Sequence, residues 1–215
     1  YQNLPALALA RRIKKKWPEK QVVLGGANCD GVMGSALARN FPFIDYVFTG
    51  EVDHSFPEYV RRTIAGESVE NTAGIVFRKP DGTLQLGPPV EPLQDMDSLP
   101  LPDFSDFIAQ RDRYGAAECQ ETTLALESSR GCWWGARQHC VFCGLNANGM
   151  GYRKKSVDRF QWELEEMVRQ YRPRYIFMTD NILPMEYQNG FLDWARDADL
   201  GVRFFYEIQC ETISG

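Results

Sequence analysis

Three cysteines lie close together in the second half of the chain and could jointly bind a soft metal. Cys132, Cys140 and Cys143 follow the spacing Cys-x7-Cys-x2-Cys. Thiolates at such spacings hold zinc or iron–sulfur clusters. A structural zinc site normally closes with four protein ligands, and His139, the extra donor at hand, adjoins Cys140 too closely to chelate well. Three thiolates on an iron–sulfur cluster would instead leave one iron open to a substrate or cofactor.

Composition narrows the class of protein that carries these thiols. The chain has 215 residues, 44% hydrophobic and 25% charged, with a net charge of −5. This balance is ordinary for a globular protein and gives no reason to expect a nucleic-acid partner. Apolar runs are far shorter than the roughly 18 residues of a membrane span, so we expect no membrane partner. Clustered cysteines without a secretion signal favour a metal or catalytic role and a cytoplasmic protein.

The first third of the chain alternates helical and strand-like segments. Helices are expected at 4–16, 35–40 and 55–65, and strands at 21–24 and 43–48. This order predicts a parallel sheet with covering helices, half of a doubly wound α/β domain over residues 1–68. Such sheets bind ligands at the carboxyl ends of their strands. Those ends hold Gly25, Gly26, Gly50 and Glu51, which could accommodate a bulky cofactor or simply turn the chain.

Residues 69–118 have a different character. Segments 74–78 and 80–83 predict a hairpin with a turn, and prolines are dense from 88 to 102. We therefore expect a partly extended linker between two domains.

From residue 119 onward a second alternation predicts part of a (β/α) barrel of the TIM type. Strands are expected at 123–127, 175–178 and 203–208, with helices from Ser156 and over 185–197. Barrel active sites lie at the carboxyl ends of the strands. The cysteine loop follows one strand and Asp180-Asn181 follows the next. Because the chain begins within an apparent helix and ends after a strand, we expect it to be a fragment.

Several strings along this second half carry a family resemblance. They are E-S-S-R-G-C-W-W-G, H-C-x-F-C-G-L-N, Tyr152-Arg153-x-Lys155-Ser156, residues 180–183 and residues 205–208. Together they resemble the cobalamin-dependent radical S-adenosylmethionine C-methyltransferases that act in the maturation of ribosomally synthesised peptides (RiPPs). The majority of radical enzymes of this kind have Cys-x3-Cys-x2-Cys, so the longer first gap matches the narrower family. Phe142 fills the usual aromatic place before the last cysteine.

The resemblance implies a set of cofactor contacts. Cys132, Cys140 and Cys143 would ligate a 4Fe–4S cluster whose fourth iron is chelated by S-adenosylmethionine. Phe142 would pack on the adenine, within the glycine-bearing loop that ends at Gly144. Asp180 and Asn181 would meet the methionine amino group, although a short polar pair could equally cap the next helix. Glu207 would point into the barrel and contact S-adenosylmethionine.

The resemblance extends to the first domain and to the reaction. Relatives carry a Rossmann-like cobalamin domain that ends as residues 21–51 do, which assigns Gly25, Gly26, Gly50 and Glu51 to cobalamin. The implied reaction removes hydrogen from an sp3 carbon of a precursor peptide through a 5′-deoxyadenosyl radical and transfers a methyl group from cobalamin. No catalytic residue beyond the cofactors is implied, and a flavodoxin or ferredoxin would supply electrons. The alternatives are a non-peptide substrate, such as a lipid or tetrapyrrole, or a non-catalytic metal-binding fragment.

Overall fold

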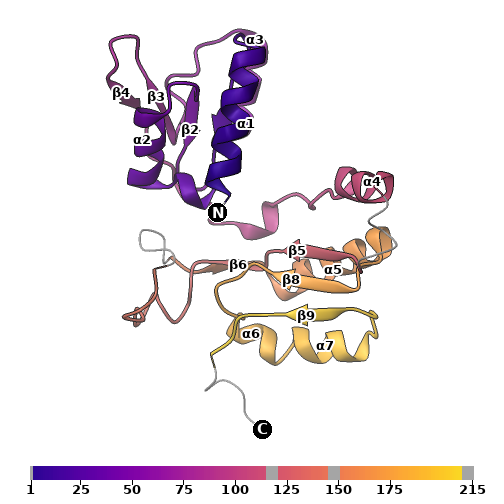
Figure 1. Cartoon of the computed structure of the whole chain (residues 1–215). Coiled ribbons are helices and arrows are strands. Elements are labelled where there is room, and N and C mark those ends of the chain that lie inside the picture. Colours follow the sequence, from indigo (N-terminus) through magenta and orange to yellow (C-terminus); the bar gives the residue numbers. More distant parts are fainter. Residues whose placement is uncertain (1, 115–120, 145–150, 210–215) are drawn as a thin grey trace. The chain divides into compact units, whose positions relative to one another are not determined.

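The computed structural model describes residues 2–114, 121–144 and 151–209 (Figure 1). The chain divides into two compact units, Tyr1–Leu93 and Gln94–Gly215. Among the described helices, none is long and apolar enough to cross a bilayer.

The first unit is a four-stranded sheet with helices on both faces. Its strands are β1 (Val23–Leu24), β2 (Tyr46–Phe48), β3 (Ile75–Arg78) and β4 (Leu84–Leu86), in that order across the sheet. Its helical segments are α1 (Asn3–Lys16), the 3-10 turn η1 (Ala27–Cys29), α2 (Gly31–Asn40) and α3 (Ser55–Ala65). Because side chains alternate along a strand, Val47 packs against Ala38 of α2 while Phe48 packs against Tyr59 of α3.

The first unit extends further along the chain than the sequence indicated. β1 and β2 are parallel as expected, but β3 pairs antiparallel with β2 and β4 pairs antiparallel with β3. The predicted hairpin therefore belongs to the sheet, and residues 69–118 are not a linker. The physical reason is that Ile75 and Val76, on opposite faces of β3, are 0% and 2% exposed and complete both core layers.

The second unit is built on three parallel strands. β5 (Thr123–Leu126), β8 (Tyr175–Met178) and β9 (Arg203–Phe205) lie side by side in that order. A separate antiparallel pair is formed by β6 (Ser129–Arg130) and β7 (Arg153–Lys154). The helical segments are η2 (Met96–Ser98), α4 (Ser105–Arg113), α5 (Val157–Tyr171), α6 (Met185–Gln188) and α7 (Phe191–Asp197).

The core of this unit lies on one face of the sheet. Leu124 and Leu126 of β5 and Ile176 and Met178 of β8 are almost fully buried. They pack against the stripe of α5, which holds Phe160, Leu164 and Met167. As predicted, Ser156 caps α5, its hydroxyl accepting from the Arg159 N–H at 3.1 Å.

The residues before β5 also belong to the second unit. Leu101 and Phe104 pack against its core, and the Phe104 N–H donates to the Tyr171 hydroxyl at 2.9 Å. The other face of the sheet is open in the described residues, with Phe177 and Phe205 stacked across β8 and β9 at 4.8 Å. The strand–helix–strand order agrees with the predicted beginning of a barrel, and closure of that barrel stays a prediction.

Three predicted elements have different bounds in the structure. The helix expected at 185–197 is two helices, α6 and α7, interrupted at Asn189 and Gly190. The helix expected at 35–40 begins earlier, at Gly31. The strand expected at 203–208 ends at Phe205, so Glu207 lies outside it and is exposed. Beyond that point the Glu207 carbonyl accepts from the Leu183 N–H at 2.8 Å, which leads the backbone out of the sheet.

Candidate metal and cofactor sites

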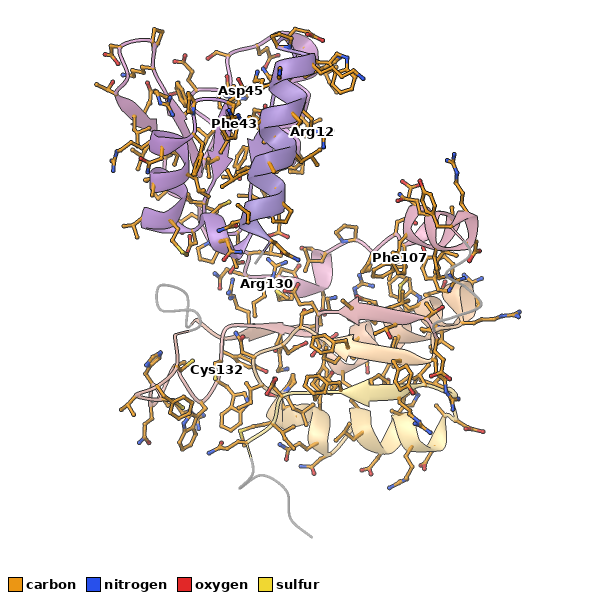
Figure 2. All side chains as sticks on the ribbon, viewed as in Figure 1. Arg12, Phe43, Asp45, Phe107, Arg130 and Cys132 are labelled. Atoms are coloured by element: carbon orange, nitrogen blue, oxygen red, sulfur yellow. The ribbon has the colours of Figure 1, made fainter. Side chains whose placement is uncertain are left out.

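The cysteine loop leaves the second unit at the carboxyl edge of its parallel sheet. β5 ends at Leu126, and the chain then enters β6 before the first cysteine. β6 pairs with β7, joining Ser129 to Lys154 and Arg130 to Arg153, so a short ribbon closes the base of the loop. Figure 2 shows Cys132 beyond the arrowheads of the unit's strands. The loop therefore lies where the sequence placed it.

A buried carboxylate lies beneath the start of the loop. Asp180, two residues after β8, is 2% exposed and accepts from the Ser128 and Ser129 hydroxyls at 2.7 and 2.6 Å. It also accepts from the Ser128 N–H at 3.0 Å. Burial raises the pKa of Asp180 above its usual range, while the serine donors oppose that rise. The structure thus brings Asp180 to the loop, but directs its oxygens toward the protein.

The residues after Asp180 continue the contact with the loop. The Asn181 side-chain amide donates to the Gly131 carbonyl at 3.2 Å. The Trp133 indole N–H donates to the Leu183 carbonyl at 3.0 Å. Segment 180–183 thereby holds segment 128–133, on both sides of Cys132. Sequence reasoning placed Asp180 and Asn181 at this edge but did not identify Ser128 or Ser129.

Three tyrosines surround the same carboxylate. Burial, together with the nearby charge of Asp180, raises the pKa of Tyr152, Tyr187 and Tyr206. The Tyr206 hydroxyl lies 3.4 Å from the Ser128 hydroxyl, and the Tyr187 hydroxyl donates to the Lys155 carbonyl at 3.2 Å. The Tyr152 hydroxyl is buried near Ser129, without a hydrogen bond of normal geometry among the described residues. Tyr152 and Tyr206 lie within the sequence motifs, but the pattern of those motifs assigns them no role.

The three cysteine side chains are thiols at the carboxyl edge of the sheet, and both features suit a soft metal. In the structure, however, the three sulfur atoms do not converge on one point. All three cysteines have intermediate exposure. The Cys132 Sγ accepts from the Gly135 N–H at 3.2 Å, while the Cys143 N–H closes a turn onto the Cys140 carbonyl at 3.0 Å. Within the part of the chain that the structure describes, no three His, Cys, Asp or Glu side chains gather closely enough to hold a metal ion. A shared metal would require the turn with Cys140 and Cys143 to approach Cys132.

The other residues predicted to contact S-adenosylmethionine are open to solvent. Phe142 is 88% exposed, and a Cβ built on Gly144 meets no described atom within 4 Å. Both positions leave room for a planar group. The Glu207 side chain is exposed outside β9, so the structure places only its backbone near segment 180–183.

The glycines of the first unit lie at the carboxyl ends of two adjacent parallel strands. Gly25 and Gly26 follow β1, and Gly50 and Glu51 follow β2. Gly26 has φ +94°, and a Cβ built there meets nothing within 4 Å, whereas one on Gly50 would lie 3.3 Å from Val90. The surface at Gly25 and Gly26 can therefore accept a bulky group against bare backbone, and Gly50 is packed.

Two polar groups near these glycines were not identified from the sequence. The Asp30 carboxylate accepts from the Gly50 N–H at 3.1 Å and so ties the two strand ends together. At the start of α3, the Ser55 hydroxyl is buried without a hydrogen-bond partner in the described residues. A buried hydroxyl of this kind is satisfied when a bound group offers an acceptor.

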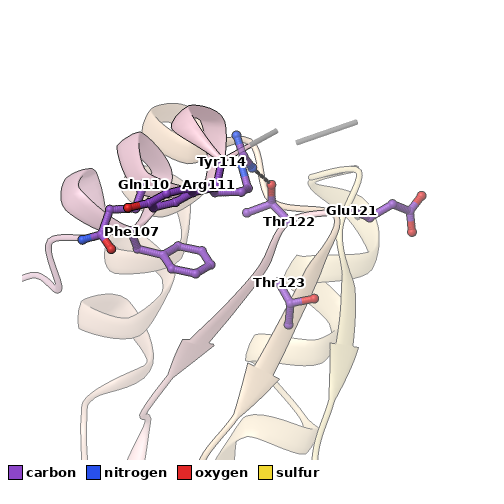
Figure 3. Close-up of a pocket in the computed structure, with 7 residues that line it drawn as sticks. All are labelled: Phe107, Gln110, Arg111, Tyr114, Glu121, Thr122 and Thr123. Carbon is purple, nitrogen blue, oxygen red and sulfur yellow. Dashed lines mark hydrogen bonds between the residues drawn. The ribbon is translucent and has the colours of Figure 1, made fainter. Parts of the chain in front are cut away.

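A separate pocket lies at the opposite, amino end of β5. It has a volume of about 370 Å³, and its walls are α4 and the first residues of β5 (Figure 3). Its one arginine, Arg111, already contacts Thr122 and forms an ion pair with Asp112 at 2.6 Å. This pocket is thus distinct from the cysteine edge, and its cation is neutralised within the protein.

Comparisons of sequence relate the chain to two curated proteins, while no family model matches it. It is 28% identical over 161 residues to an uncharacterized methyltransferase of Pyrococcus horikoshii, covering 74% of this chain and 33% of that protein. It is 24% identical over 208 residues to the anaerobic magnesium-protoporphyrin IX monomethyl ester cyclase of Rubrivivax gelatinosus, covering 94% and 35%. The chain thus spans about a third of the length of these relatives.

Comparisons of structure agree on the fold. OxsB, a cobalamin-dependent S-adenosylmethionine radical enzyme solved with aqua-cobalamin, matches with a TM-score of 0.67 and 16% identity, covering 92% of this chain and 27% of that one. TsrM of Kitasatospora setae, a radical S-adenosylmethionine methyltransferase solved with cobalamin and a 4Fe–4S cluster, matches with a TM-score of 0.59 and 16% identity, covering 93% and 40%. The chain has the mixed α/β fold of a part of these cobalamin-dependent radical enzymes, with both of its units included in the match.

Proposed function

We propose that the chain is the cofactor-binding part of a cobalamin-dependent radical S-adenosylmethionine methyltransferase. The observation that carries this proposal is a loop with three cysteine thiols, fixed at its base to the carboxyl edge of a parallel sheet, in a fold shared with OxsB and TsrM. When bound, the cofactors would supply hydrogen abstraction from an unactivated carbon and methyl transfer. The protein's part is to bind them, orient them and exclude water.

The residues of the second unit would hold the cluster and S-adenosylmethionine. Cys132, Cys140 and Cys143 are the thiolate ligands. Their donor type suits an iron–sulfur cluster, and three of them leave one iron for S-adenosylmethionine. Phe142 offers an exposed ring for the adenine, beside the open backbone at Gly144.

Two polar side chains extend this binding surface. The half-buried amide of Asn181 keeps a hydrogen on Nδ2 after donating to Gly131, and this hydrogen can serve the methionine carboxylate. The exposed Glu207 carboxylate can turn toward the methionine amino group or the ribose.

The first unit would hold cobalamin at the carboxyl ends of β1 and β2. Gly25 and Gly26 provide a surface without side chains, with Gly50 and Glu51 on the adjacent strand end. The unpartnered hydroxyl of Ser55 supports a polar contact there. Replacing Gly25 with leucine meets little resistance from the protein, because the nearest atom to its Cβ is 3.9 Å away. It should therefore abolish aqua-cobalamin binding without unfolding the unit.

The substrate has two candidates. The string around Cys132 supports a ribosomal precursor peptide methylated at an sp3 carbon. The Rubrivivax gelatinosus relative, matched over 94% of this chain, supports a tetrapyrrole instead. In either case we propose a cytoplasmic enzyme that takes electrons from a flavodoxin or ferredoxin.

Metal content after anaerobic reconstitution tests the proposed cluster. The proposal predicts about four irons and four sulfides per chain, lost in Cys132→Ala, Cys140→Ala and Cys143→Ala. Cys29→Ala is the matched control, because Cys29 is 3% exposed in the core of the first unit. About one zinc per chain without sulfide would contradict the proposal and indicate a structural metal module.

A further inference from the structure

We infer that Asp180 is a positioning residue, which sets the geometry of the cysteine loop through Ser128 and Ser129 and does not itself contact a cofactor. The inference rests on the proposed function, because it concerns the loop that would hold the cluster. It assigns Asp180 a different role from the contact with the methionine amino group that the family resemblance implies.

Three protein donors already bind the buried Asp180 carboxylate. Oδ1 accepts from the Ser128 hydroxyl at 2.7 Å, the Ser129 hydroxyl at 2.6 Å and the Ser128 N–H at 3.2 Å. Oδ2 accepts from the same N–H at 3.0 Å. Ser128 is 0% exposed, Ser129 and Asp180 are 2% exposed, and two carboxylate oxygens offer about four acceptor sites in all. An ammonium group from a ligand would have to enter a place that is closed to solvent and compete there with the serine donors.

The hydrogen bonds made by Asp180 and the residues after it fall on both sides of Cys132 along the chain. Ser128 and Ser129 lie four and three residues before Cys132, and Asp180 lies 52 residues beyond Ser128. Asn181 and Leu183 continue the same contact on Gly131 and Trp133. The chain on both sides of Cys132 is therefore held by the segment that follows β8.

The first thiol belongs to the held segment, and the residues that follow this segment donate hydrogen bonds to Cys132. The Gly135 N–H donates to the Cys132 Sγ, and the Ala136 N–H donates to the Cys132 carbonyl at 2.8 Å. Fixing segment 128–133 therefore orients this thiol before any metal is present. In the proposed enzyme, Cys132 is the prearranged ligand onto which the turn with Cys140 and Cys143 closes.

The variant Asp180→Asn separates positioning from ligand contact. The oxygen of the new amide can still accept hydrogen bonds from the serine hydroxyls. Its N–H group, however, faces the Ser128 N–H, so two donors meet where a carboxylate oxygen had accepted. Hydrogen exchange of the metal-free chain should then rise about tenfold over residues 128–136, the factor expected for losing one buried hydrogen bond. In the reconstituted protein, the electron paramagnetic resonance spectrum of the reduced cluster should change shape.

Leu164→Val is the matched control, because Leu164 is fully buried on α5 and contributes to general stability. It should raise exchange across the sheet and α5 and leave the spectrum unchanged. Identical exchange patterns in the two variants would overturn the inference. It would also be overturned if Asp180→Asn left the loop and spectrum unaltered while weakening S-adenosylmethionine binding. A wild-type chain that takes up no iron would refute the proposed function alone, and the exchange comparison would still decide the role of Asp180.

Discussion

At the scale of single residues, the hydroxyl groups beneath the cysteine loop differ in how they are satisfied. The Tyr187 hydroxyl donates to the Lys155 carbonyl, while the buried Tyr152 hydroxyl has no hydrogen-bond partner in the described residues. A buried hydroxyl without a partner costs about 1–3 kcal/mol. The Tyr152 hydroxyl should therefore contribute nothing to the stability of the metal-free chain.

The pair of tyrosines gives a direct test in the metal-free protein. Tyr152→Phe should leave the free energy of unfolding unchanged or raise it by up to about 1 kcal/mol, because it removes an unsatisfied group. Tyr187→Phe should lower that free energy by about 1 kcal/mol, because it leaves the Lys155 carbonyl without its donor. Urea unfolding measures both, and the reverse order of stabilities would refute this description of the two hydroxyls.

At the scale of elements, the base of the loop is fastened to α5 by a buried ion pair. The Lys155 ammonium donates to both Glu163 oxygens, at 2.8 and 2.7 Å, and the two side chains are 3% and 0% exposed. Arg159 adds a second cation, 3.6 Å from Glu163. The Lys155 N–H also donates to the Ser128 carbonyl at 2.8 Å, so the end of β7, the start of α5 and the Asp180 cluster form one connected structure.

Breaking this pair from one side should be costly. Glu163→Gln leaves the Lys155 ammonium buried without its counter-charge and should lower the free energy of unfolding by about 3–5 kcal/mol. The double variant Lys155→Met/Glu163→Leu should recover most of that loss, because two apolar side chains replace the buried pair and Arg159 keeps its hydrogen bonds to the Asp97 and Leu99 carbonyls. Equilibrium unfolding in urea provides the comparison. A cost below about 1 kcal/mol for the single change would show that water reaches the pair.

Much of the secondary structure could be predicted from the sequence, because it depends on residues that are close together in the chain. The stripe and cap of α5 and the apolar runs of β5 and β8 depend on nearby residues, and the structure confirms them. The antiparallel pairing of β3 with β2 depends on partners distant in sequence, which no local pattern reveals. Contacts such as Ser128 to Asp180 were missed for the same reason, since 52 residues separate them.

At the scale of the whole molecule, the two units each present the carboxyl ends of parallel strands with candidate binding residues. The first unit depends on β3, whose Ile75 and Val76 are almost completely buried. The chain ending at residue 93 should therefore fold by itself, whereas the chain ending at residue 68 should not. Circular dichroism and cooperative thermal unfolding distinguish the two. A cooperative transition in the shorter chain would contradict the boundary that the structure gives.

The match to the fold of OxsB and TsrM spans both units of the chain. The site residues differ in how firmly the structure positions them. Segment 180–183 holds the chain on both sides of Cys132, Phe142 is exposed, and the three thiols do not converge in the part of the chain that the structure describes. The central claim is that these thiols bind a cluster with one iron open to S-adenosylmethionine.

Electron paramagnetic resonance of the reduced, reconstituted chain, recorded with and without S-adenosylmethionine, tests that claim most directly. The account predicts a signal of a 4Fe–4S cluster that shifts when S-adenosylmethionine is added, and that is absent in Cys143→Ala. A cluster signal that does not respond to S-adenosylmethionine, or a reconstituted chain with no such signal, would contradict it.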